Sequence, residues 1–340
     1  MIPHLVLAAS LVLAPVGTGV RAADSSAGGT GHGFSTSVSL WESTGNTTWS
    51  HDASAAEPRF GNPTSRLEYD SVNATILELR GRLELPAGVF LELAYGAGDA
   101  DDGRLTDTDF ASALGADAFG TTVAGAHAYS ESESALDGDS VHYFDARLGR
   151  EMFRSRDNRS RAGLALRYLD WTEQYSARGV NQTLCTAPGR LCLPGGTVAF
   201  GDREVIHNDA RWRAVFVGIW GQHRMNDRFE LSARLAFSPL VDLSSDDRHL
   251  LRTDLAQDPS FRLTGQGRAA TARIEASYRF TPRLTAGLGA RYWWMEVRNE
   301  SRGFTAFPTG AAPFSARLNS FESERLGVTA SVTYTFGPVD

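Results

Sequence analysis

The chain contains no lysine, so arginine supplies all of its permanently charged basic side chains. Its 40 acidic residues outnumber the 33 arginines, and the formal net charge is −7. A protein that binds nucleic acid needs a concentrated positive surface. The composition therefore argues against a nucleic-acid partner.

Cysteine is nearly as scarce, since Cys185 and Cys192 are the only two in the chain. They flank Pro188 and Gly189 in a polar segment, and in an exported protein this spacing predicts a small disulfide across a turn. Two thiolates with no adjacent histidine cannot complete the four ligands of a zinc site. We therefore expect no metal at this position.

Long apolar runs are also missing. After the first residues no stretch of about 18 apolar residues occurs, which excludes a transmembrane helix. The early run Leu5–Leu13 is too short to span a membrane and is followed by helix breakers. It predicts a secretory signal over residues 1–22, cleaved near Ala22 or Ala23. Residues 23–340 are then expected to form one domain, because no linker or repeat divides them.

What the chain does contain is period-two alternation, which is typical of β-strands. Within residues 75–85 the leucines fall on one face, and Glu78, Arg80, Arg82 and Glu84 fall on the other. The same pattern recurs over residues 89–95, 164–168, 210–220, 229–237, 270–280 and 326–336. The chain is therefore predicted to be all-β.

Two features of these strands favour a membrane barrel over a soluble sandwich. Their apolar faces mix alanine and glycine with large residues, whereas a sandwich core fills its volume more evenly. Aromatic residues also cluster near strand ends, as in an interfacial girdle. The residues expected in that girdle are Tyr95, Tyr168, Trp171, Trp220, Tyr292, Trp293, Trp294, Tyr334 and Phe336.

The connections between strands are alternately short and long, which is typical of an outer-membrane barrel. Short turns are predicted at residues 86–88, 155–160, 225–227 and 281–282. Long polar excursions are predicted near residues 42–65, 97–140, 172–206, 238–268 and 298–322. This pattern predicts a ten-stranded antiparallel transmembrane β-barrel with long extracellular loops and short periplasmic turns. A passive pore is disfavoured, because charged side chains should fill so narrow a lumen.

Two pairs of polar residues suggest chemistry. Asp107 and Asp109 form one pair, Asp247 and His249 form the other, and both are spaced i, i+2. In an extended chain this spacing puts both side chains of a pair on one face. If the pairs face each other across the mouth of the barrel, the histidine could act as a general base while Asp247 holds its tautomer. Of the two crowded aspartates, one should keep a proton. Hydrolysis is therefore the leading hypothesis.

Each pair also has a plainer interpretation. Residues 96–110 are acidic and rich in glycine, as in a solvated loop. Calcium binding is disfavoured there, because Gly103 falls one place early after Asp99 and no glutamate closes the loop. The second pair, taken alone, could be an acidic loop with a chance histidine. The presence of both pairs favours catalysis.

Taken in order, these motifs resemble the omptin family of outer-membrane proteases, and the resemblance covers most of the mature chain. Ser65–Tyr69 is similar to the second strand of the family, and Leu105–Phe110 resembles its Asp-x-Asp-aromatic motif. Phe229–His249 aligns without a gap to the strand that bears the Asp-x-His motif, and Thr333–Phe336 resembles the closing strand. The resemblance implies a monomeric barrel in the outer membrane of a Gram-negative bacterium, with its active site facing outward.

The resemblance also implies an endopeptidase in which Asp247 and His249 activate water. Asp107 and Asp109 would then position that water and stabilise the oxyanion, without a covalent acyl-enzyme. The expected partners are peptide or protein substrates, outer-membrane lipid and lipopolysaccharide. No cofactor is expected, and lipopolysaccharide is the expected activator. The alternative is a barrel of the same fold that does not cleave and serves as an adhesin or surface-binding protein.

Two departures from the family pattern bear on function. The specificity of the family for basic residues depends on acidic side chains low in the pocket, and the matching positions here are Ser245 and Trp49. A buried guanidinium needs a carboxylate partner, so we expect a different or relaxed specificity. The chain also continues for four residues past Phe336, whereas barrels of this type usually end on the aromatic residue.

Overall fold

The computed structural model describes residues 33–119, 127–189 and 192–336. The predicted signal segment and the four residues after Phe336 lie outside these ranges. The strands are β1 (Phe34–Asp52), β2 (Phe60–Leu85), β3 (Val89–Asp101), β4 (Arg104–Ala111), β5 (His127–Leu136), β6 (Asp139–Arg154), β7 (Ser160–Cys185), β8 (Thr197–Arg224), β9 (Phe229–His249), β10 (Phe261–Arg279), β11 (Leu284–Ala306) and β12 (Phe314–Phe336). The short helices are η1 (Pro86–Gly88), η2 (Ala113–Gly115) and α1 (Ala116–Phe119). In this part of the chain, no helix has the length and apolarity needed to cross a membrane.

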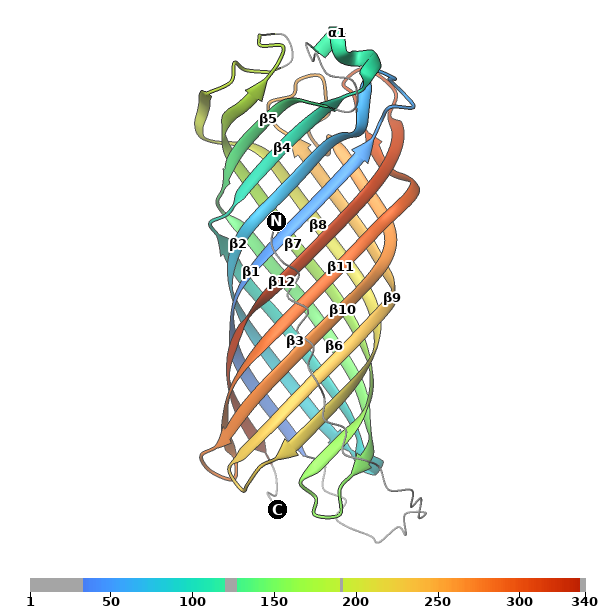
Figure 1. The fold of residues 1–340 in the computed structure, drawn as a ribbon. Coiled ribbons are helices and arrows are strands. Elements are labelled where there is room, and N and C mark those ends of the chain that lie inside the picture. The colour runs from blue at the N-terminus through green and yellow to red at the C-terminus, as the bar shows by residue number, and fades with distance from the viewer. Residues whose placement is uncertain (1–32, 120–126, 190–191, 337–340) are drawn as a thin grey trace. The chain divides into compact units, whose positions relative to one another are not determined.

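The strands form one antiparallel sheet that closes on itself (Figure 1). Strand β1 pairs with both β2 and β12, which closes the ring. Strands β3 and β4 follow one another along β2, and β6 and β5 follow one another along β7. Each of these two pairs therefore counts as a single barrel strand with a two-residue interruption. The predicted ten-stranded antiparallel barrel is confirmed.

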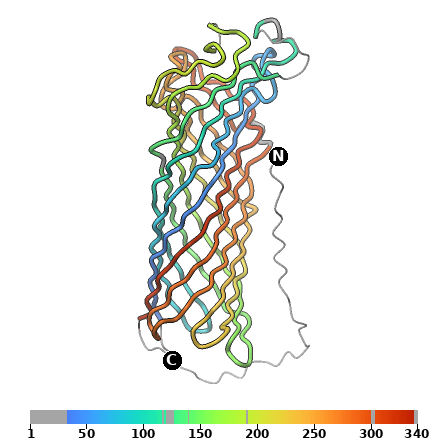
Figure 2. The backbone as a smooth tube through the Cα atoms, turned by 60° about the vertical axis from the view of Figure 1, so that its left-hand side comes forward, coloured from blue at the N-terminus to red at the C-terminus, as the bar shows by residue number. Residues whose placement is uncertain are grey.

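The predicted short turns are confirmed as the connections β2–β3, β6–β7, β8–β9 and β10–β11. The predicted long excursions differ, because most of their residues continue the strands. Residues 53–59, 112–126, 186–196, 250–260 and 307–313 connect the strands at that end. Figure 2 shows the tall barrel wall that results. Beyond the lipid both strand faces can be polar, so alternation fades while the backbone groups still pair in the sheet.

The outer face of the barrel carries the apolar residues. Leu77, Leu166, Val217 and Val328 are each 55–63% exposed. Such a band suits lipid. The expected girdle residues Tyr95, Tyr168, Tyr334 and Phe336 do lie on this outer face, at 37–55% exposure.

Three tryptophans were placed wrongly by the sequence pattern. Trp171, Trp220 and Trp293 are at most 7% exposed and are not in the lipid-facing girdle. The apolar row of β8 that contains Trp212 and Phe216 is likewise buried, while the neighbouring row of β8 is exposed. Both faces of β8 are apolar in this region, so periodicity alone could not identify the face that meets lipid.

Aromatic rings fill the middle of the lumen and form a plug. Trp41, Trp171, Trp293 and Tyr143 contact one another, with ring centroids 4.4–6.1 Å apart. The guanidinium of Arg291 lies 4.7 Å from the Trp41 ring. All five side chains are almost completely buried. The lumen is therefore closed by packed rings at this level.

We expect this plug to prevent passive ion flow. In planar bilayers the wild-type protein should show no steady conductance, because dry packed rings leave no hydrated path. A porin inserted under the same conditions provides the positive control. A stable open channel formed by the wild-type protein would contradict this expectation.

Candidate active site

The break between β3 and β4 reverses which residues face the lumen. Even-numbered residues such as Glu92 are buried in β3, whereas in β4 the odd-numbered Leu105 is fully buried. At the break, Gly103 adopts a φ of +119°, a conformation that favours glycine. The irregularity turns Asp107 and Asp109 inward. If the alternation of β3 had continued, both aspartates would face outward.

A second irregularity, in β9, likewise reverses which residues face the lumen. Below it the even-numbered Arg234 reaches into the lumen, and above it the odd-numbered Ser245 and Asp247 are fully buried. The change occurs at Pro239, which has no N–H to donate to a neighbouring strand. The Ser238 hydroxyl accepts a hydrogen bond from the backbone N–H two residues later, at 3.2 Å. Sheet register shifts beside this segment against both neighbouring strands.

Asp247 and His249 form a close pair at the end of β9. His249 Nε2 lies 2.8 Å from Asp247 Oδ2, and Asn208 Nδ2 donates a 3.0 Å hydrogen bond to Asp247 Oδ1. The His249 ring stands edge-on to Phe261, with centroids 5.0 Å apart. Burial by itself lowers the pKa of His249, but the adjacent Asp247 carboxylate outweighs burial and raises it. The carboxylate therefore orients the imidazole and stabilises its protonated form.

Asp107 and Asp109 lie on the facing wall. Ser65, which is opposite Asp109 in the sheet, donates a 3.1 Å hydrogen bond to Asp107 Oδ1. Burial, followed by the charge of Asp107, raises the pKa of Asp109 to about 7. Burial also raises the pKa of Asp107, against the opposing charge of His249. One proton is thus retained by this pair near neutral pH.

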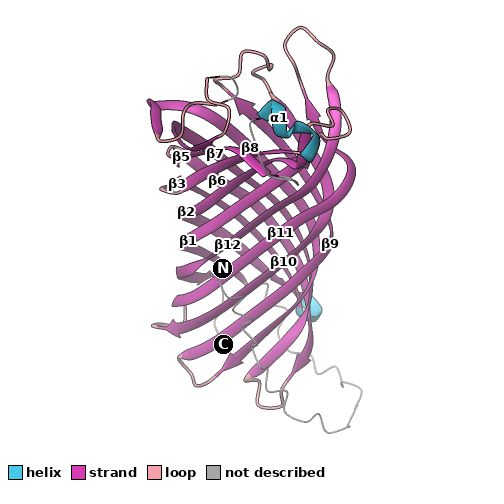
Figure 3. Ribbon diagram, turned by 45° about the horizontal axis from the view of Figure 1, so that its top comes forward, coloured by secondary structure: helices cyan, strands magenta, loops and turns pink. Residues whose placement is uncertain are grey.

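The two pairs act on one another electrostatically across the lumen. The charge of His249 affects the pKa of both Asp107 and Asp109, and the charge of Asp107 in turn raises the pKa of His249. In the ring, β4 and β9 are separated by β5, β7 and β8 on one side. Figure 3 brings the end of the barrel that carries them toward the reader. The four residues singled out in the sequence therefore converge at one end of the barrel.

His51 was not singled out in the sequence, yet it lies beside the site. Its ring stacks on Phe304 with centroids 3.9 Å apart, and Phe304 also contacts Phe261 at 5.0 Å. Burial, followed by the charge of His249, lowers the pKa of His51 to about 3. His51 is therefore neutral at physiological pH. The only local feature of the sequence that could have indicated His51 was its position two residues after Trp49, on the same strand face.

The two residues expected in the substrate pocket are completely buried. Trp49 packs near His51 and Phe304, with ring centroids 6.0 and 6.4 Å apart. Ser245 Oγ accepts a 3.1 Å hydrogen bond from Asn208, the residue that also holds Asp247. The floor beside the dyad is thus made of aromatic rings, a hydroxyl and an amide.

Arg252 supplies positive charge near the aspartates. Its guanidinium forms a two-point ion pair with Asp254, with N–O distances of 2.6 and 2.7 Å. Its charge lowers the pKa of Asp107 and Asp109, although other influences dominate. Within the described ranges, histidine, cysteine and carboxylate side chains form no group of three that could hold a metal ion.

The two cysteines lie at the same end of the barrel. Cys185, the last residue of β7, forms a disulfide with Cys192, and their Cα atoms are 5.9 Å apart. The bridge closes a short segment that begins where strand pairing between β5 and β7 ends. It therefore ties down a connection near the mouth of the lumen.

Comparisons with known proteins identify relatives of this chain. The model of the Omptin family matches residues 147–336. The crystal structure of the outer membrane protease OmpT from Escherichia coli is similar over 89% of this chain and 97% of its own, with a TM-score of 0.69 and 18% identity. The toluene transporter TbuX of Ralstonia pickettii overlaps with 91% of this chain and 90% of its own, at 10% identity and a TM-score of only 0.29. No curated protein matches the chain.

Proposed function

The chain belongs to the omptin family of Gram-negative outer-membrane proteins, and from this premise we propose that it is an endopeptidase that hydrolyses peptide bonds at the outer mouth of the barrel. The observation that carries the proposal is the 2.8 Å contact between His249 and Asp247, opposite Asp107 and Asp109. A solvent molecule held between the two pairs would be the nucleophile.

The dyad would act as the general base. Because His249 Nε2 faces Asp247, the other ring nitrogen, Nδ1, is left to accept a proton from water. As the water oxygen attacks the carbonyl carbon, its proton moves to His249, and the Asp247 carboxylate stabilises the imidazolium. The same proton then passes to the leaving amine, so His249 returns to its neutral form.

The facing aspartates, Asp107 and Asp109, would bind the carbonyl oxygen of the substrate and the attacking water. The carboxyl group that keeps its proton can donate a hydrogen bond to the carbonyl oxygen, which becomes negative as the tetrahedral intermediate forms. The ionised carboxylate of the pair can accept a hydrogen bond from the attacking water and so position it. The raised pKa of Asp109 supports this division of roles.

This division of roles predicts a narrow optimum near neutral pH. Activity should rise with pH as His249 loses its proton, because only the neutral imidazole is a base. Activity should fall as Asp109 ionises with a pKa of about 7, because it can then no longer donate. Asp109→Asn should lower activity but remove the alkaline limb, since asparagine keeps donors and does not ionise. Measuring kcat/KM from about pH 5 to about pH 9 checks this, and an unchanged alkaline limb in the variant would contradict it.

The preferred cleavage site is tested with a peptide library. Because Trp49 and Ser245 bring no carboxylate to the floor of the site, we propose that cleavage is not restricted to basic residues. We also propose that lipopolysaccharide activates the monomeric protein, so the refolded protein is assayed with and without it. The expected products include fragments ending at uncharged residues, with higher yield when lipopolysaccharide is present.

The matched variants for this assay are Asp247→Ala and Asp246→Ala. Asp247 is completely buried beside His249. Asp246 lies on the outer side of the same strand, where it pairs with Arg262 of β10 at 2.7 Å. Library cleavage should be lost in the first variant and kept in the second. Cleavage only beside basic residues would refute the proposed specificity, and equal loss in both variants would refute the role of the dyad.

A further inference from the structure

The lumen also contains a polar cavity below the aromatic plug, on the side away from the candidate active site. Its volume is about 290 Å³, and residues of β1, β2 and β7 through β12 line most of it. Arg224 and Arg279 belong to this lining and are the last residues of β8 and β10, next to two of the short turns. The space therefore lies at the periplasmic end, far from the candidate active site.

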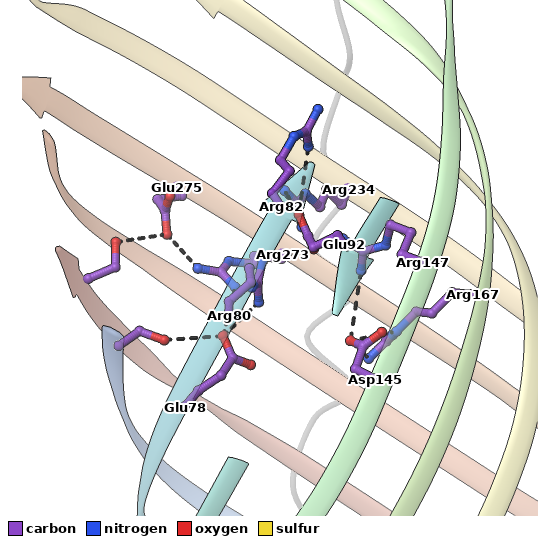
Figure 4. Close-up of polar contacts among 12 residues, drawn as sticks. Glu78, Arg80, Arg82, Glu92, Asp145, Arg147, Arg167, Arg234, Arg273 and Glu275 are labelled. Carbon is purple, nitrogen blue, oxygen red and sulfur yellow. Dashed lines mark hydrogen bonds and ion pairs between the residues drawn. The ribbon is translucent and has the colours of Figure 1, made fainter. Parts of the chain in front are cut away.

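The lining of this space carries more positive than negative groups, with seven arginines and four glutamates. The deeper arginines crowd around few carboxylates, as Figure 4 shows. Glu92 alone lies within 3.6 Å of Arg80, Arg82 and Arg234, and Arg273 pairs with Glu275 at 2.6 Å. Glu78, next to this lining, also pairs with Arg80 at 2.6 Å and with Arg273 at 3.8 Å. The lining arginines that form no ion pair among the described residues are Arg161, Arg224 and Arg279.

Two of these three arginines of the lining, Arg161 and Arg224, form no ion pair among the described residues. Arg161 donates to the neutral amide oxygen of Gln222, at 2.7 Å. The buried Nε atom of Arg224 has no hydrogen-bond partner among the described residues. Arg273 Nη1 is also buried without a hydrogen-bond partner among these residues, and its ion-pair partner Glu78 is 3.8 Å away. Unsatisfied charged donors are costly in a membrane-embedded lumen, so this arrangement favours an additional acceptor.

We infer that the periplasmic half of the lumen binds a small multivalent oxyanion of the phosphate class. The planar guanidinium group binds phosphate oxygens through two parallel hydrogen bonds. An anion with two or more charges would neutralise the excess of arginine and supply acceptors to Arg161 and Arg224. Hydroxyl groups of Ser35, Ser277 and Thr333 also line the space and can donate to it. This binding is separate from peptide cleavage.

The inference is tested by calorimetry on the protein refolded in a zwitterionic detergent. Inorganic phosphate and pyrophosphate are titrated at constant ionic strength, with sodium chloride as the reference anion. Saturable binding is expected for both phosphates, with pyrophosphate the tighter because it carries more charge. Absence of saturable binding, or equal binding of chloride, would overturn the inference.

A double variant locates the site. Arg224→Gln with Arg279→Gln removes two guanidinium groups from the lining and should weaken phosphate binding by about tenfold or more. Arg213→Gln is the matched control, because this arginine is exposed on the outer face of β8. Heat-modifiable gel mobility verifies that each variant folds. Unchanged affinity in the folded double variant would place the anion elsewhere and refute the inference.

Discussion

His249→Ala should reduce kcat/KM for peptide cleavage by about 10²- to 10⁴-fold, the usual contribution of a general base. Alanine cannot accept the proton of the attacking water, and it leaves the buried Asp247 carboxylate without the imidazole ring that it orients. Initial rates on a fluorogenic peptide chosen from the library provide the measurement. The barrel itself should still form, because the lipid-facing band lies elsewhere.

The matched control for this variant is His142→Ala. His142 is exposed on the outer face of β6, so its loss should leave the rate within about twofold of wild type. If the His249 variant still cleaves at the wild-type rate, the dyad mechanism fails. If neither the wild type nor the variant cleaves, but both bind a host surface equally, the alternative of an adhesin is supported.

Glu92→Gln should lower the free energy of unfolding by about 3–5 kcal/mol, the range for removing one partner of a buried ion pair. Glu92 is 4% exposed and accepts hydrogen bonds from Arg80, Arg147 and Arg234 at 2.8–3.1 Å. An amide of the same shape removes the only ion-pair partner of Arg234 among the described residues, while Arg80 keeps Glu78 and Arg147 keeps Asp145. Urea titration of the protein in lipid vesicles measures the change.

Glu84→Gln is the control for this prediction. Glu84 pairs only with Arg82 among the ion pairs of the described residues, at 2.7 Å, and its side chain is 44% exposed. Water screens such a pair, so its loss should cost about 1 kcal/mol or less. Combining Glu92→Gln with Arg234→Gln should recover part of the lost stability. Equal effects of Glu84→Gln and Glu92→Gln would show that the buried cluster contributes no special stability.

The sequence located the strands and short turns well, because alternation and turn residues are local properties. It failed where both faces of a strand are apolar. In β8 the row with Val215 and Val217 is exposed, and the row with Trp212 and Phe216 is buried, yet both rows satisfy the pattern expected of a lipid face. Nothing local distinguishes a ring that meets lipid from a ring that fills a lumen.

For the candidate site too, the sequence showed local spacing but not the neighbours that the fold brings together. The spacing of Asp107 with Asp109, and of Asp247 with His249, identified both pairs. The residues that hold them, Ser65 and Asn208, could not be identified, because they meet the pairs only through sheet register. His51 likewise reaches the site from β1, far away in the sequence.

By itself, the sequence determined that this chain forms a ten-stranded barrel and which two polar pairs could carry its chemistry. Only the tertiary structure decided that those pairs point into the lumen. The alternation of β3 and of lower β9 would have directed them outward, and irregularities at Gly103 and Pro239 reverse it. The physical reason is that a one-residue change of phase moves every following side chain to the opposite face of a strand.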